Sequence, residues 1–147
     1  MSGKIDLYST SRDGDLVSVR AALARGQNSN TRGGPDDLPC LLAAVAKGHK
    51  EIVSALLQQE DCDLSQGNND KSTALHFACR FGRVGMVRQL ASHPRQGSLN
   101  SKSDGDTPIM WAVYHGHADC ILALGRLPGV DLDTRDRDGK SLEEMAR

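Results

Sequence analysis

Four glycines of this chain are separated by equal intervals. Gly14, Gly48, Gly82 and Gly116 are each 34 residues apart (48−14, 82−48 and 116−82). A fixed period of roughly 20–50 residues is typical of proteins built from stacked structural repeats. Such a stack is quasi-one-dimensional and presents an extended binding surface. The period therefore constrains the fold, and it favours binding over catalysis in an enclosed cavity.

Other positions agree when the sequence is divided at this period. A large aliphatic residue, a small residue and a β-branched residue each recur once per unit. These columns are Leu7, Leu41, Leu75 and Ile109; Thr10, Ala44, Ala78 and Ala112; and Val19, Val53, Val87 and Ile121. Apolar residues within one unit, as in 52–57, have the spacing of a short amphipathic helix. We predict two short helices per unit, joined at the periodic glycine and followed by a polar loop. One such pair cannot bury its own apolar face, so the units must stack.

Helix starts and turns are also marked in the sequence. Thr107 precedes Pro108, which is the pattern of a hydroxyl N-cap before a proline in the first helical position. Thr73 is the equivalent residue one unit earlier, whereas Pro39 occupies this place in the unit before. At that helix start, Asp37 or a backbone group must provide the cap. Turn-forming residues that favour tight hairpins fill the loops at 33–35, 67–70, 104–106 and 138–140.

Composition limits the partner and the compartment. The 147 residues include 18 Lys or Arg and 19 Asp or Glu, a formal net charge of −1, which argues against nucleic acid and against a polybasic membrane anchor. The apolar runs are too short to span a bilayer, and the first residues lack the pattern of a signal peptide. The cysteines at 40, 62, 79 and 120 include no C-x-x-C pair. We expect reduced thiols and a location in the cytoplasm or nucleus.

Several segments carry a family resemblance. Residues 72–79, Ser-Thr-Ala-Leu-His-Phe-Ala-Cys, are similar to the opening motif of the ankyrin repeat, and 104–113 form a second copy. Gly48-His49 and Gly116-His117 resemble its link into the second helix. The resemblance implies an all-α ankyrin-repeat solenoid with β-hairpin-like loops, in one domain over 1–147. It divides the chain into a divergent N-terminal repeat at 4–34, repeats at 35–68, 69–102 and 103–136, and a partial repeat at 137–147.

The resemblance also implies where a partner binds. In ankyrin proteins the first helices and hairpin tips line a concave groove that contacts other proteins. All five aromatic residues of this chain fall on predicted first helices, and aromatic and Arg side chains dominate interface hot spots. The predicted partner-binding residues are Phe77, Arg80, Phe81, Trp111, Tyr114, His115, Lys47 and Arg12. The alternative is that Phe77 and Trp111 pack between neighbouring repeats.

Signs of chemistry are few. His115, His117 and Cys120 could suggest a metal site, but His117 holds the family's structural Gly-His position and Cys120 a buried column, so we predict no metal. We find no phosphate loop, zinc-protease motif or nucleophile elbow, and we predict no cofactor and no enzyme activity. Asn30 and Asn100 hold a loop position that is a hydroxylation target in some ankyrin proteins. Their alternative role is that of structural turn residues.

The resulting prediction is a non-catalytic module for protein–protein interaction. We expect a monomeric adaptor or scaffold that binds another protein or a peptide segment, without nucleic acid or membrane. The alternative is a stand-alone inhibitor that covers a partner enzyme such as a kinase. A third possibility is a structural spacer within a longer chain. Because the fold does not determine the function, the identity of the partner depends on the surface residues alone.

Overall fold

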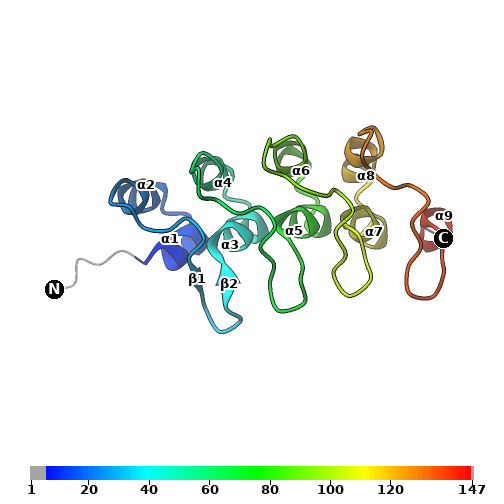
Figure 1. Cartoon of the computed structure of the whole chain (residues 1–147), viewed down its shortest axis with the longest axis horizontal. Coiled ribbons are helices and arrows are strands. Elements are labelled where there is room, and N and C mark those ends of the chain that lie inside the picture. Colours follow the sequence, from blue (N-terminus) through cyan, green and yellow to red (C-terminus); the bar gives the residue numbers. More distant parts are fainter. Residues whose placement is uncertain (1–5, 147) are drawn as a thin grey trace.

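The computed structural model describes residues 6–146, so expectations for residues 1–5 and 147 lie outside the described part. The chain forms two parallel rows of short helices with loops projecting to one side (Figure 1). The inner row contains α1 (Leu7–Asp13), α3 (Cys40–Lys47), α5 (Ala74–Arg80), α7 (Pro108–Tyr114) and α9 (Leu142–Met145). The outer row contains α2 (Leu16–Ala24), α4 (Lys50–Leu57), α6 (Val84–Ala91) and α8 (Ala118–Gly125). The predicted helical solenoid is therefore confirmed, and each predicted repeat contributes one inner helix.

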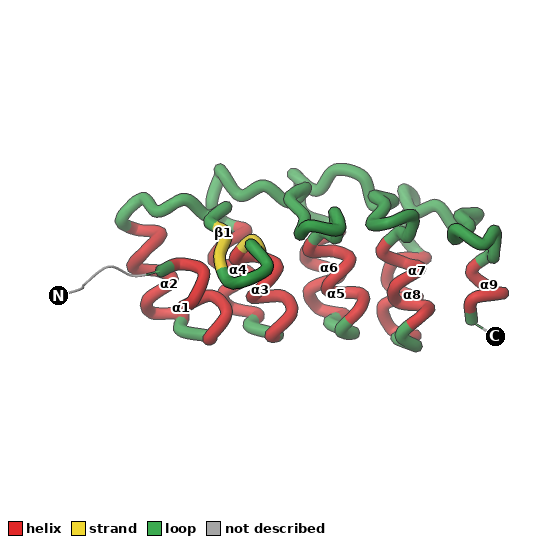
Figure 2. The backbone as a smooth tube through the Cα atoms, turned by 90° about the horizontal axis from the view of Figure 1, so that it is seen from below, coloured by secondary structure: helices red, strands yellow, loops and turns green. Residues whose placement is uncertain are grey.

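The periodic glycines form the turns between inner and outer helices. Figure 2 shows these short turns along one edge of the stack and the long loops along the other. All four glycines adopt positive φ, between 68° and 84°, where a side chain is strained. At Gly14 an added Cβ would also lie 2.7 Å from the ring of His49 in the next repeat. The turn glycines thus allow both the left-handed conformation and the close approach of the neighbouring repeat.

A recurring hydrogen bond ties each turn to the preceding repeat. Nε2 of His49 donates to the Arg12 carbonyl at 2.9 Å, and His117 bonds to the Arg80 carbonyl at 2.8 Å. Arg83 holds the same position in the repeat between them, and its Nη2 donates to the preceding repeat at 2.9 Å. We call these three contacts the reach-back bonds. They satisfy carbonyl groups at the ends of inner helices, which the helix itself leaves unpaired.

Helix starts follow the sequence signals. Thr73 caps α5 in a capping box: its N–H donates to Nδ1 of His76 at 3.2 Å, and its hydroxyl oxygen accepts the His76 N–H. At α3 the cap comes from the backbone, because the Cys40 N–H donates to the Thr31 carbonyl at 2.9 Å. Asp37 lies in the hairpin turn at φ 49° and does not cap α3, so the second of the two predicted alternatives is correct.

Two of the loops close as hairpins. Strands β1 (Arg32–Gly33) and β2 (Leu38–Pro39) pair antiparallel, with Arg32 opposite Pro39. An isolated antiparallel bridge joins Ser103 and Asp106 across the second hairpin. Tyr8 packs beneath the first hairpin, where an added Cβ on Gly33 would lie 2.6 Å from its ring. Tyr8 is consequently buried and contributes to the core.

The core runs continuously along the stack between the two rows. The aliphatic column of the inner helices is at most 2 % exposed, and Val19, Val53 and Val87 of the outer helices are fully buried. Burying one such side chain contributes about 1.5–3 kcal/mol relative to leaving it exposed. All four cysteines are buried free thiols. Among the helices within residues 6–146, none has the length and apolar character needed to cross a membrane.

Candidate protein-binding surface

Five side chains gather where the ends of α5 and α7 meet the hairpin before α7. We call them the aromatic–cation surface: Arg80, Phe81, Trp111, Tyr114 and His115. Arg80 and three of the others line a hollow of about 330 Å³ together with Asp106 of that hairpin. Phe81 and Tyr114 are 40 % and 47 % exposed, large fractions for aromatic side chains. The structure thus brings five of the eight predicted partner-binding residues to one place.

Phe81 is fixed in its exposed position by its neighbours. Its ring packs edge-to-face on the ring of Phe77, with centroids 6.2 Å apart. The guanidinium groups of Arg80 and Arg83 lie 5.4 Å and 5.9 Å from its centroid. An ordered aromatic ring loses little conformational freedom when a partner covers it, which favours tight binding. The arrangement therefore presents a preorganised anchor.

Trp111 and Tyr114 are held by polar and aromatic contacts from two directions. The Trp111 ring meets the His76 ring edge-on at 5.1 Å and is half-buried. The Tyr114 hydroxyl donates to a carboxylate oxygen of Asp136 in the next loop at 2.6 Å. This bond raises the pKa of Tyr114 and lowers the pKa of Asp136. Both groups therefore keep the protonation states that the bond requires at neutral pH.

The electrostatics of the hollow are mixed. Burial lowers the pKa of His115, and the positive charge of Arg80 lowers it further. His115 is therefore largely neutral at pH 7. Burial raises the pKa of Asp106 at the opposite wall. A partner therefore meets the positive charge of Arg80 and the carboxylate of Asp106 beside aromatic rings.

The other three predicted residues lie apart from this surface or beneath it. Phe77 is only 8 % exposed and belongs to the core, so it supports Phe81 from below; this is the packing alternative. Trp111, the other residue of that alternative, is shared between packing and surface. Arg12 on α1 is paired with Asp13 at 2.8 Å, and Lys47 lies exposed at the end of α3.

Two of the three residues considered for metal binding, His117 and Cys120, have structural roles, and the third, His115, belongs to the aromatic–cation surface. His117 makes a reach-back bond, and burial raises the pKa of the Cys120 thiol to about 11, which disfavours the thiolate that metals require. Over residues 6–146 no three His, Cys, Asp or Glu side chains gather in a way that could hold a metal ion.

The two loop asparagines bridge repeats. The Asn30 amide donates to the Asp61 carbonyl at 2.6 Å, and its oxygen accepts the Asp63 N–H at 2.8 Å. Asn100 makes the same pair of bonds with Gly129 and Asp131. These bonds are those expected of asparagines with a structural role in the turn. Hydroxylation of either asparagine stays a prediction, to be checked by mass spectrometry of the protein from its own cells.

Sequence reasoning missed Arg83 as a contact of Phe81. The signal was present, since arginine stands at 83 where the equivalent positions 49 and 117 hold histidine. A residue that departs from its column is a candidate for a role that the other repeats lack. Arg83 combines the structural bond of the column with a permanent guanidinium charge beside the Phe81 ring.

The helix rows, hairpins and exposed surface define a repeat protein that can present a rigid face to a partner. The chain belongs to the ankyrin-repeat family: the model for three ankyrin repeats matches residues 7–97 and 41–136. Ankyrin repeats bind other proteins, so the family indicates protein–protein interaction.

Relatives share the repeat region and not the whole of their length. The probable E3 ubiquitin-protein ligase XBOS32 of rice is 35 % identical over 118 residues, covering 78 % of this chain and 23 % of the relative. The E3 ubiquitin-protein ligase XBAT33 of Arabidopsis thaliana is 36 % identical over 118 residues, covering 78 % and 22 %. Mouse ankyrin repeat and SOCS box protein 11 is 31 % identical over 103 residues, covering 70 % and 31 %. The chain thus spans about a quarter of the two ligases and somewhat more of the third relative.

Proposed function

We propose that this chain is a non-catalytic adaptor that binds a segment of another protein at the aromatic–cation surface. The observation that carries the proposal is the exposure of two aromatic rings beside Arg80: Phe81, whose ring centroid lies 5.4 Å from its guanidinium, and Tyr114, which lines the same hollow as Arg80. Large aromatic side chains usually lie inside a soluble protein, and exposed clusters with Arg are typical of interface hot spots. The segment would place an apolar side chain between the two rings and an acidic or carbonyl group on Arg80.

The relatives support a role in recognition. In the rice and Arabidopsis proteins named as E3 ubiquitin-protein ligases, the matched repeats make up only about a quarter of the length. A separate part of those chains has room for the named activity. By analogy, this chain would hold a partner protein and leave any chemistry to another protein or domain.

The test is affinity capture from cell lysate, with proteins identified by mass spectrometry. The test variant combines Arg80→Ala, Phe81→Ala and Tyr114→Ala. The control variant changes three exposed outer-row residues of similar type, Val17→Ala, Leu122→Ala and Arg126→Ala. Circular dichroism and urea unfolding would establish that both variants fold.

We expect partners that the control retains and the test variant loses. Retention of every partner by both variants would contradict the proposal and move the binding site elsewhere. The captured proteins also separate the two roles considered for the chain. An adaptor captures two partners that do not compete, whereas an inhibitor captures one enzyme and lowers its rate.

A further inference from the structure

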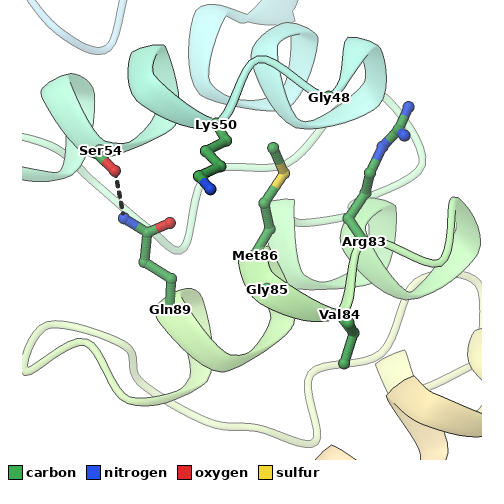
Figure 3. Close-up of a pocket in the computed structure, with 8 residues that line it drawn as sticks. All are labelled: Gly48, Lys50, Ser54, Arg83, Val84, Gly85, Met86 and Gln89. Carbon is green, nitrogen blue, oxygen red and sulfur yellow. Dashed lines mark hydrogen bonds between the residues drawn. The ribbon is translucent and has the colours of Figure 1, made fainter.

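A second hollow, of about 520 Å³, lies between the outer helices α4 and α6. It belongs to the row of helices that does not form the aromatic–cation surface (Figure 1). Figure 3 shows Lys50 of α4 and Met86 of α6 extending into the space between the two helices. One end is closed by a hydrogen bond from the Gln89 amide to the Ser54 hydroxyl at 2.9 Å. We call this hollow the outer groove.

Gly85 keeps the outer groove open. It is the second residue of α6, and the equivalent positions in the other outer helices are Val17, Glu51 and Asp119, all exposed. A Cβ on Gly85 would meet no atom within 4 Å, and its φ is outside the left-handed region. Glycine is among the poorest helix formers, so the helix itself does not favour it here. Its one evident effect is to leave the groove without a side chain in its wall.

The charge of the outer groove is positive and unbalanced. Lys50 and Arg83 line it, and none of the eight lining residues that the structure describes has a carboxylate. Neither cation forms an ion pair within residues 6–146. Nη2 of Arg83 makes the reach-back bond to the Ala46 carbonyl, whereas its Nε is buried without a hydrogen-bond partner. Figure 3 shows the Arg83 guanidinium beside Gly48, at the edge of the groove, where its positive charge adds to that of Lys50.

The apolar wall and the polar groups of the outer groove favour the same kind of ligand. Val84 and Met86 give the groove an apolar wall, and α6 begins without a side-chain cap for its first amide groups. A carboxylate near these amides and the two cations would be favourable, since anions are stabilised near helix N-termini and beside Lys and Arg. An aliphatic side chain next to that carboxylate would fill the space above Gly85.

We propose that the outer groove binds an acidic peptide segment of a second protein. A carboxylate of the segment lies between Lys50 and Arg83, and a neighbouring aliphatic side chain packs over Gly85 against Met86. This site is a different hollow from that of the aromatic–cation surface, although Arg83 lies between the two, lining the outer groove and contacting the Phe81 ring. The chain would therefore hold two partners at once, as an adaptor must.

The test is selection from a random dodecapeptide phage library on the purified protein. The counter-target is Gly85→Leu, which fills the groove with a strong helix former whose Cβ would meet no atom within 4 Å. Val17→Leu is the matched control, because it places leucine at the equivalent helix position outside the groove. Thermal unfolding would verify that both variants are folded.

We expect the selected peptides to combine Asp or Glu with Leu, Ile, Val or Met. A synthetic copy of the best peptide should lose about tenfold or more in affinity on Gly85→Leu and on Lys50→Glu, the scale of one charge-assisted hydrogen bond. Val17→Leu and Tyr114→Ala should leave its affinity unchanged.

Arg83→His separates the charge from the fold. Histidine at 49 and 117 already makes the reach-back bond, so this variant should keep that bond while removing the positive charge at neutral pH. We expect native stability with weakened peptide binding. Selected peptides without an acidic bias, equal affinity for Gly85→Leu and wild type, or failure to select any peptide in preference to the counter-target would each overturn the proposal.

Discussion

Replacing His76 tests how neighbouring repeats are coupled. Its side chain is fully buried and forms hydrogen bonds with two elements, the start of α5 and the hairpin before α7. Nδ1 accepts the Thr73 N–H at 3.2 Å, so this nitrogen carries no proton. Nε2 must then carry one, and it donates to the Asp106 carbonyl of the next hairpin at 2.9 Å. One neutral ring thereby caps α5 and fastens the following repeat to it.

The size of the effect follows from these two bonds. His76→Ala leaves the buried Thr73 N–H without a partner, which costs about 1–3 kcal/mol, and it opens a cavity. The Asp106 carbonyl loses its bond to His76 and keeps the one that it accepts from the Ser103 N–H. We expect a loss of about 4 kcal/mol in the free energy of unfolding. His76→Gln should lose only about 1–2 kcal/mol, because glutamine can reach back to the N-cap N–H of Thr73 but cannot span to Asp106. The difference between the variants measures the cap, and the residual loss in His76→Gln measures the bond between repeats.

The pH dependence provides an independent check. Burial lowers the pKa of His76 in the folded state below 6.5. Below pH 6.5 the unfolded chain therefore binds a proton at this site that the folded chain resists, so this group lowers stability as pH falls through that value. The contribution of one proton is limited to about 1.4 kcal/mol per pH unit. His76→Gln should have a smaller loss of stability between pH 6.5 and 5.5 than the wild type.

Urea unfolding, followed by the helical signal in circular dichroism, would give the free energy of unfolding of the wild type, His76→Ala and His76→Gln at pH 7.5, 6.5 and 5.5. Equal stabilities for His76→Gln and His76→Ala would refute the assignment of the cap. An unchanged pH dependence in His76→Gln would refute the assignment of the buried neutral ring.

Further predictions concern glycine, a helix cap and the thiols. Gly82→Ala should destabilise the protein by about 2 kcal/mol, since φ is +68° and the new Cβ would lie 2.7 Å from the His117 ring. Gly85→Ala should stabilise it by roughly 0.5–1 kcal/mol, because alanine is the better helix former and its Cβ meets no atom within 4 Å. Urea unfolding of the two variants would therefore show effects of opposite sign. Arg95→Met should cost about 1–2 kcal/mol in the same assay, because its guanidinium donates to the Leu57 carbonyl and to two carbonyls that follow it at the end of α4. The four buried cysteines should not react with Ellman's reagent at pH 8 until urea unfolds the chain, and rapid reaction of the native protein would contradict their burial.

The sequence period was sufficient to predict the fold, because the residues that recur with it determine the backbone turns and the buried faces. The four glycines mark left-handed turns, and the apolar columns mark faces that only stacking can bury. Thr73 marks a helix start for a local reason, the hydrogen bonds that it exchanges with His76 three residues later. Thr107 also precedes a helix, but its hydroxyl is buried and makes no capping hydrogen bond, so the predicted cap is wrong there. The start of α3 shows the limit of such reasoning: the Cys40 N–H donates to the Thr31 carbonyl, which lies nine residues before Cys40 and across a hairpin.

The candidate surface was only partly predictable. Position in the repeat placed Phe77 and Phe81 on the same helix end, yet one is buried and the other 40 % exposed. The two positions differ in every repeat, since 13, 47 and 115 are exposed like Phe81, whereas 9, 43 and 111 are partly or fully buried like Phe77. The outer groove was not foreseen at all, because it results from an absent side chain at Gly85 and from the conformations of Lys50 and Arg83 on separate helices.

The reach-back bonds have a consequence for how a protein of this kind changes length. Donors at 49, 83 and 117 and acceptors at 12, 46 and 80 are each offset by one period, so every joint has the same pattern. If one 34-residue unit were removed, the donor of the following unit would meet an equivalent carbonyl in the new neighbour. A duplicated unit would likewise insert with both joints intact. The protein can therefore gain or lose binding surface in whole repeats, and the hydrogen bonds between the remaining repeats stay the same.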